Sequence, residues 1–204
     1  MFIAWDLFTA NFGWMGWNLF LAFIPLALSL ILFNHNQRSY KDWRNLLWWL
    51  GFLIFVLFLP NAPYIATDVI HLINDLREPE ISRTGLLFLI IPQYIFFLVA
   101  GFECYVMSLI NLYTYLQSRN IINQAIWLEL AINFVCAVGV YLGRFNRLNS
   151  WNIVTKPIRL ARAVTDNLDS YHFVIFTLLF FIVITTLYYL FKGASIAIFK
   201  LNQD

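Results

Sequence analysis

Five long apolar runs constrain the fold of this chain more than any other feature. Crossing the hydrocarbon core of a bilayer as a helix takes about 20 mostly apolar residues. Of the 204 residues, 61% are hydrophobic and 12% are charged, and the mean hydropathy is +0.72, a composition that soluble domains of this size do not have. We predict an all-α fold, a polytopic transmembrane helical bundle of about five spans plus short juxtamembrane helices. It forms one multi-pass domain over residues 1–204, with spans at about 14–33, 44–60, 86–110, 126–142 and 172–191.

The second apolar run is shorter than the others. It covers residues 46–59 and reaches full length only if its helix starts at Trp43 or Arg44, or if segment 60–63 turns back into the membrane. With five spans, the loops after the second and fourth spans (loop two and loop four) share one side of the membrane. Counting Lys and Arg gives six on one side and seven on the other, so the positive-inside rule leaves the orientation open.

Loop two carries a pair of prolines followed by titratable side chains. Pro60 and Pro63 predict the end of the helix, because proline cannot donate its amide and pushes the preceding residue out of helical geometry. Asn61 then caps a new helix, in which polar residues on one face recur at spacings of four, three and four: Tyr64, Asp68, His71 and Asp75. A helix broken in this way often binds anions or ions at its free amides. The alternative is an ordinary cap followed by a solvated juxtamembrane helix.

Loop four begins with two arginines three residues apart. Arg144 and Arg147 are followed by Asn149, Ser150 and Trp151. A planar guanidinium donates two hydrogen bonds at once to a phosphate or carboxylate, so this loop predicts an anion site. The alternative is a general attraction of cations to lipid head groups. Further along, basic and apolar residues mix over 155–166, which predicts a short helix along the membrane surface.

Each of these loops contains a longer motif. The motifs are the sequence PNAPY at 60–64 with Thr67, Asp68, His71 and Leu72, and the sequence GRF at 143–145 with Arg147 and the sequence NSW at 149–151. Together they resemble a family of small bacterial integral membrane proteins catalogued as a domain of unknown function, over nearly the whole chain. The resemblance implies a multi-span protein of the bacterial plasma membrane and no established activity. An acid often follows the Ser-Trp pair in that family, whereas this chain has Asn152, which weakens any mechanism that needs a carboxylate there.

The loop residues suit three kinds of chemistry. In the first, Arg144 and Arg147 bind an anionic head group while Asp68 and His71 act as a catalytic acid/base pair, since histidine titrates near neutral pH. The second is a metal site with Asp68, His71 and His172 among its ligands. The third is a serine hydrolase that uses Ser150 with His71. The sequence names no cofactor, and the predicted ligand-binding residues are Asn61, Tyr64, Thr67, Arg144, Arg147, Asn149, Ser150 and Trp151.

Two acids, Glu103 and Glu129, fall inside apolar runs. They either belong to an ion or proton path, or are protonated and hydrogen-bonded to Asn133 or a tyrosine. The spans show no inverted repeat, so a transporter of this kind needs a homodimer or a partner membrane subunit. Three functions stay open: binding or transport of an anionic or lipid-linked ligand, an enzyme acting on a lipid or phosphate head group, and a structural or assembly factor. Membrane lipids are the expected partners, and the net charge of +2 indicates no nucleic-acid partner.

Overall fold

The described part of the chain is helical, and none of it lies in a β-strand. The structure, a computed structural model, describes residues 2–33, 45–121, 125–148, 152–168 and 170–201. Five helical stretches in it are long and apolar enough to cross a membrane: Ala4–Leu32, Leu46–Leu76, Arg83–Ser118, Ile126–Phe145 and Tyr171–Ile198. The predicted all-α transmembrane class is therefore confirmed.

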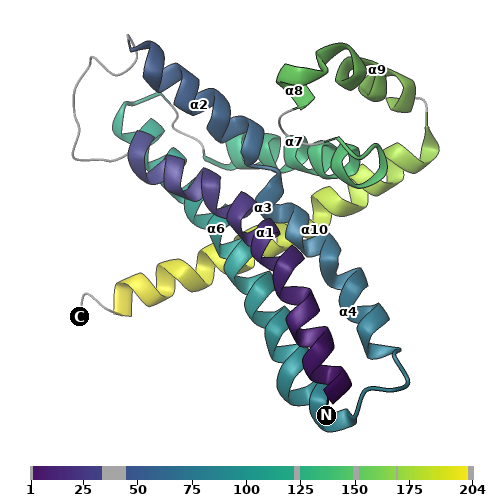
Figure 1. Cartoon of the computed structure of the whole chain (residues 1–204). Helices are drawn as coiled ribbons and strands as arrows, with labels where there is room; N and C mark the ends of the chain where they lie inside the picture. Colours follow the sequence, from purple (N-terminus) through teal and green to yellow (C-terminus); the bar gives the residue numbers. More distant parts are fainter. Residues whose placement is uncertain (1, 34–44, 122–124, 149–151, 169, 202–204) are drawn as a thin grey trace.

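Two helices, α1 (Phe2–Leu32) and α6 (Ile91–Ser118), run side by side in the same direction at the centre of the bundle (Figure 1). The Asn111 amide of α6 donates to the Ser29 hydroxyl of α1 at 2.9 Å. In a bilayer the hydrophobic effect does not drive helices together, so packing and interhelical hydrogen bonds of this kind stabilise the pair. α6 follows two short elements, α5 (Arg83–Gly85) and the π-helical η3 (Leu86–Ile90). It supplies many of the large buried side chains, among them Tyr94, Phe97, Tyr105 and Leu109.

The second span is one long helical path with a change of pitch near its middle. The backbone stays right-handed helical at the junctions, with φ −64° and ψ −17° at Pro60 and φ −52° and ψ −27° at Val69. The path consists of α2 (Leu46–Phe58), α3 (Asn61–Tyr64), the 3-10 helix η2 (Ile65–Asp68) and α4 (Val69–Leu76). α2 ends at Phe58, just before Pro60, as the prolines predict, but Leu59 and Pro60 keep helical geometry and α3 follows directly, so the helical path continues.

Asn61 explains why the helix continues through the prolines. Its side-chain amide donates to the Phe58 carbonyl at 2.9 Å, and the Ala62 amide bonds to the Leu59 carbonyl at 3.2 Å. A side chain and one tighter turn therefore compensate for the missing proline amides. The predicted role of Asn61 as a helix cap was wrong, because its amide group donates to the preceding turn.

The ends of the helices differ from the predicted spans. α2 begins at Leu46, where the Asn45 side chain caps it by accepting from the Leu47 amide at 3.0 Å; Trp43 and Arg44 lie outside the described residues. α1 begins at Phe2, well before the predicted start at residue 14. The last helix, α10 (Tyr171–Leu201), continues past residue 191. Lys192 therefore belongs to a helix that can span the membrane, and not to a C-terminal tail.

A second pair of antiparallel helices, α7 (Ala125–Phe145) and α10, crosses the first pair (Figure 1). α10 also contacts α6, and α7 contacts α3. The short helix predicted over 155–166 corresponds to α9 (Pro157–Leu168), which follows α8 (Asn152–Thr155). This arrangement brings the C-terminal end of α7 to the middle of the second span.

Candidate functional site

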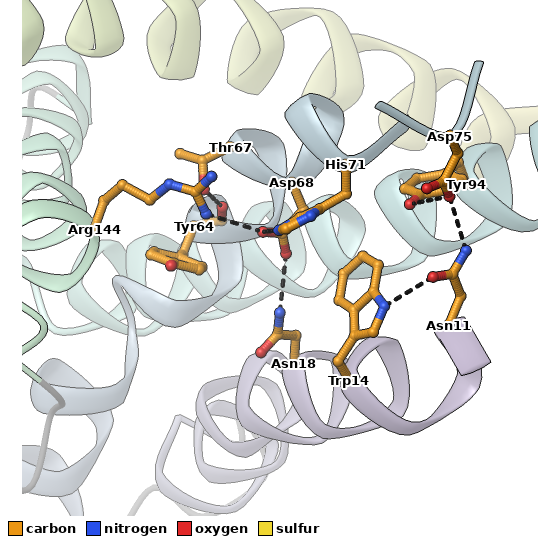
Figure 2. A network of polar contacts seen from close by, with 10 residues as sticks. All are labelled: Asn11, Trp14, Asn18, Tyr64, Thr67, Asp68, His71, Asp75, Tyr94 and Arg144. Carbon is orange, nitrogen blue, oxygen red and sulfur yellow. Dashed lines mark hydrogen bonds and ion pairs between the residues drawn. The ribbon is translucent and has the colours of Figure 1, made fainter. Parts of the chain in front are cut away.

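A buried aspartate lies where the second span meets the end of α7 (Figure 2). Asp68 is only 2% exposed. Arg144 Nη1 lies 3.6 Å from Asp68 Oδ1, and His71 Nε2 lies 4.0 Å from the same oxygen. The Asn18 amide of α1 donates to the other oxygen, Oδ2, at 2.9 Å. Arg144 thus balances a charge that would be costly to bury alone.

A second aspartate, Asp75, is bound in a similar way seven residues further along. Its Oδ2 accepts from the Asn11 amide at 3.0 Å and from the Tyr94 hydroxyl at 2.9 Å. Trp14 Nε1 donates to Asn11 Oδ1 at 3.0 Å, and the Trp14 ring lies 5.0 Å from the His71 ring, centroid to centroid. Figure 2 shows both groups along the contact between α1 and the second span. We call this set the polar interface.

The polar interface follows from a matched spacing in two antiparallel helical segments. Asn11 and Asn18 are seven residues apart on α1, and Asp68 and Asp75 are seven residues apart on the second span. A step of seven residues returns to the same helix face, so each asparagine lies opposite one aspartate. Sequence reasoning missed four residues that contact the predicted site, because each stands alone in an apolar run: Asn11, Trp14, Asn18 and Tyr94. The equal spacing was the signal that could have revealed the asparagines.

The two arginines of loop four have different surroundings. The Arg144 side chain is 26% exposed. Arg147 is exposed and has φ 51°, in the left-handed region. It lies where α7 ends, and just after it the Leu148 amide bonds back to the Leu142 carbonyl at 3.1 Å. Among the described residues, therefore, Arg144 meets the acid of loop two and Arg147 has no ion-pair partner.

The other predicted ligand-binding residues are only partly brought together. The Thr67 hydroxyl donates to the Tyr64 carbonyl at 2.7 Å, so it stabilises the local helix. The Tyr64 ring lies close to Gly143, since a Cβ added at Gly143 would be 3.5 Å from Tyr64 Cε2. Three predicted residues lie outside the described residues: Asn149, Ser150 and Trp151.

Two of the three chemistries predicted for these loops, the metal site and the serine hydrolase, need His172 or Ser150 in addition to Asp68 and His71. The described residues contain no group of three or more His, Cys, Asp or Glu side chains able to hold a metal ion. Asp68, His71 and His172 are accordingly not assembled into a metal site, and His172 is exposed at the start of α10. The serine hydrolase hypothesis depends on Ser150, and it stays a prediction.

A groove of about 450 Å³ adjoins this site: Asn18, which donates to Asp68, and Gly143, which precedes Arg144, line it, whereas Asp68 and Arg144 themselves do not. α1, the second span and α7 form its walls, and Asn18, Tyr64 and Gly143 line the part nearest to Asp68 and Arg144. Deeper along the same helices the walls are apolar, with Val135 among them. Val135 is 59% exposed, so this part of the groove opens on the surface that a bilayer would cover.

The acids inside the apolar runs belong to a separate network on α10. Glu129 accepts from the Tyr188 hydroxyl at 2.8 Å and forms an ion pair with Lys192. The Ser195 hydroxyl donates to Glu103 at 2.6 Å. Of the partners predicted for Glu129, a tyrosine is the one observed. This network ties α10 to α6 and α7.

The fold and the buried acid–arginine contact define the class: a multi-pass integral membrane protein with a polar site where the end of α7 meets the second span. The chain belongs to the family described as protein of unknown function DUF1361, whose model matches residues 17–187. That match includes both motif loops. No curated protein and no solved structure matches the chain.

Proposed function

We propose that this protein binds a membrane ligand with an anionic head group, a phosphate or a carboxylate, in the groove beside Asp68. The observation that carries the proposal is the Arg144 guanidinium, which is about three-quarters buried against Asp68. It lies next to a groove that its neighbour Gly143 lines and that opens towards lipid. A guanidinium has five N–H donors, and those of Arg144 make no hydrogen bond with a described residue. A phosphate or carboxylate accepts two of these donors at once.

The free-energy cost of burying charge supports a functional role for the ion pair between Arg144 and Asp68. Replacing a buried ion pair by apolar residues of similar size is often neutral or stabilising. Charged side chains inside membrane segments are rare and mark ligand or ion sites. Asp68, held by Asn18 at 2.9 Å, orients Arg144 in the free protein, and a ligand anion competes with it for the guanidinium.

An enzyme acting on the head group is the second candidate, and His71 is the observation that favours it. Its side chain is 47% exposed and lies 4.0 Å from Asp68, and its ring contacts Trp14. This position lets His71 exchange protons with water and with the buried acid, which general acid–base catalysis requires. In that case His71→Gln abolishes turnover and leaves binding unchanged.

The proposed partners are the lipids themselves, in the plasma membrane of a bacterium. The two loop motifs support this assignment, and one chain supplies every wall of the groove.

Binding of dodecyl phosphate tests the proposal. Wild-type protein, Arg144→Gln and the control Arg147→Gln are placed in zwitterionic lipid nanodiscs, and affinities for dodecyl phosphate and neutral dodecyl maltoside are measured by native mass spectrometry. We expect wild type and Arg147→Gln to prefer the phosphate, and Arg144→Gln to bind it at least tenfold more weakly. Tenfold corresponds to about 1.4 kcal/mol, the scale of one charge-assisted contact. Equal binding by the two arginine variants, or no preference for phosphate over maltoside, would refute the proposal.

A further inference from the structure

The groove next to Asp68 adjoins a second cavity of about 360 Å³, which we call the far cavity. The walls of this far cavity come from α2, α6 and α7 and are almost wholly apolar. Val56, Pro60 and Val135 line both cavities. The two cavities therefore adjoin at these residues, and together they extend from the polar site to Trp48 and Trp49.

The contact between α7 and the proline segment explains why the groove exists. Gly139 lets α7 approach closely, since a Cβ there would lie 3.0 Å from Pro60 Cβ. α7 packs on α3 at this point. Beyond this contact α2 and α7 scarcely touch, and apolar side chains of both helices line the far cavity.

The length of the groove limits what can fill it. Along α7 it extends from Gly143 to Leu128, or about 22 Å at roughly 1.5 Å per residue. The apolar stretch Ile126–Phe145 of α7 is roughly 30 Å long, which matches the thickness of the hydrocarbon core and leaves this helix little room to tilt. One leaflet accounts for about half of that thickness. A chain that follows the groove from the polar site therefore passes the middle of the bilayer.

We infer that the ligand is an anionic lipid with an apolar chain longer than one leaflet is deep, the class to which polyprenyl phosphates belong. The head group lies at Arg144, and the chain passes Val135 into the far cavity. The inference rests on the proposed function and names its ligand class. An ordinary membrane lipid that fills the groove without selection is the competing occupant.

Chain-length dependence tests the inference in the same nanodiscs. Octyl phosphate is short enough to occupy only the near cavity, whereas solanesyl phosphate reaches the far one. Ala131 is exposed and lines only the far cavity, so Ala131→Trp blocks it. Ala194 is an equally exposed alanine on α10, and Ala194→Trp is the matched control. We expect Ala131→Trp to lower the affinity ratio of solanesyl to octyl phosphate at least tenfold, with octyl phosphate binding unchanged and the control like wild type.

A photoreactive probe gives a second readout on the unmodified protein. Octadecyl phosphate with a diazirine at the chain end should form adducts on far-cavity residues such as Phe52 and Leu128. Two results would overturn the long-chain inference: adducts scattered over lipid-facing residues, or an affinity ratio that is unchanged in Ala131→Trp. The proposed function would still stand in either case if binding of octyl phosphate depends on Arg144. If octyl phosphate binding does not depend on Arg144, the proposed function fails, and the inference fails with it.

Discussion

Removing Arg144 should destabilise the protein more than removing its partner Asp68, because the two side chains are buried to different degrees. The side chain of Asp68 is 3% exposed and that of Arg144 is 26% exposed. In Arg144→Gln the carboxylate stays buried, with the Asn18 amide as its hydrogen-bond donor among the described residues and His71 at 4.0 Å. In Asp68→Asn the new side chain still accepts from Asn18, and Arg144 keeps its contact with solvent.

The size of this difference follows from the distance and the burial. At 3.6 Å the Coulomb attraction is about 4–5 kcal/mol with an effective dielectric constant near 20, which sets an upper limit. The partial exposure of Arg144 lowers that figure, so we expect a loss of about 3 kcal/mol for Arg144→Gln. The Asp68→Asn variant loses about 1 kcal/mol, because the neutral side chain keeps the Asn18 hydrogen bond and Arg144, which loses its ion partner, is partly exposed to solvent. In the double variant no charge is orphaned, so Asp68→Asn restores about 2 kcal/mol to the Arg144→Gln protein.

The measurement is the free energy of unfolding in dodecyl maltoside micelles titrated with sodium dodecyl sulfate and followed by tryptophan fluorescence. Arg147→Gln is the control, since Arg147 is exposed and has no ion-pair partner among the described residues, and it should change stability by less than about 0.5 kcal/mol. Equal losses in Arg144→Gln and Asp68→Asn, or no recovery in the double variant, would show that burial of the carboxylate does not dominate this contact.

Two further predictions concern packing elsewhere, and thermal unfolding in micelles measures both. Lys192→Met leaves the buried Glu129 without its ion partner and should cost about 3 kcal/mol, most of which Glu129→Gln recovers; an unchanged midpoint in Lys192→Met would contradict this. A methyl group at Gly101 clashes with Ile65, so Gly101→Ala should lower the stability by about 1–3 kcal/mol. At Gly193 nothing lies within 4 Å of an added Cβ, so Gly193→Ala should raise the stability by about 0.5–1 kcal/mol. A gain in Gly101→Ala would argue against the close contact of η2 with α6.

Some features of the site could be predicted from the sequence because they depend on local spacing. Asp68, His71 and Asp75 recur at helical intervals, and in the structure Asp68 and Asp75 bond to α1 side chains while His71 contacts Trp14. Spacing also pointed to Arg144, since it and Arg147 stand three residues apart at the start of loop four. Loop two and loop four had to share one side of the membrane, because the number of spans requires it.

Other features escaped because they depend on which neighbour each residue meets. Whether a helix passes a proline depends on what satisfies the carbonyls that the proline leaves free. The sequence pattern could not show that Asn61 donates to the Phe58 carbonyl. The predicted last span ended at residue 191 and left out Lys192, because the acid that pairs with this lysine lies on another helix.

The sequence alone determined that this chain is a multi-pass helical membrane protein of the DUF1361 family, because apolar length and loop motifs are properties of continuous segments. Only the tertiary structure decided that Arg144, and not Arg147, reaches Asp68, and that Asn18 lies opposite that acid. It also decided that α2 and α7 leave a groove between them. The physical reason is that helix crossing and register arise from side-chain packing between distant segments, which no local pattern records.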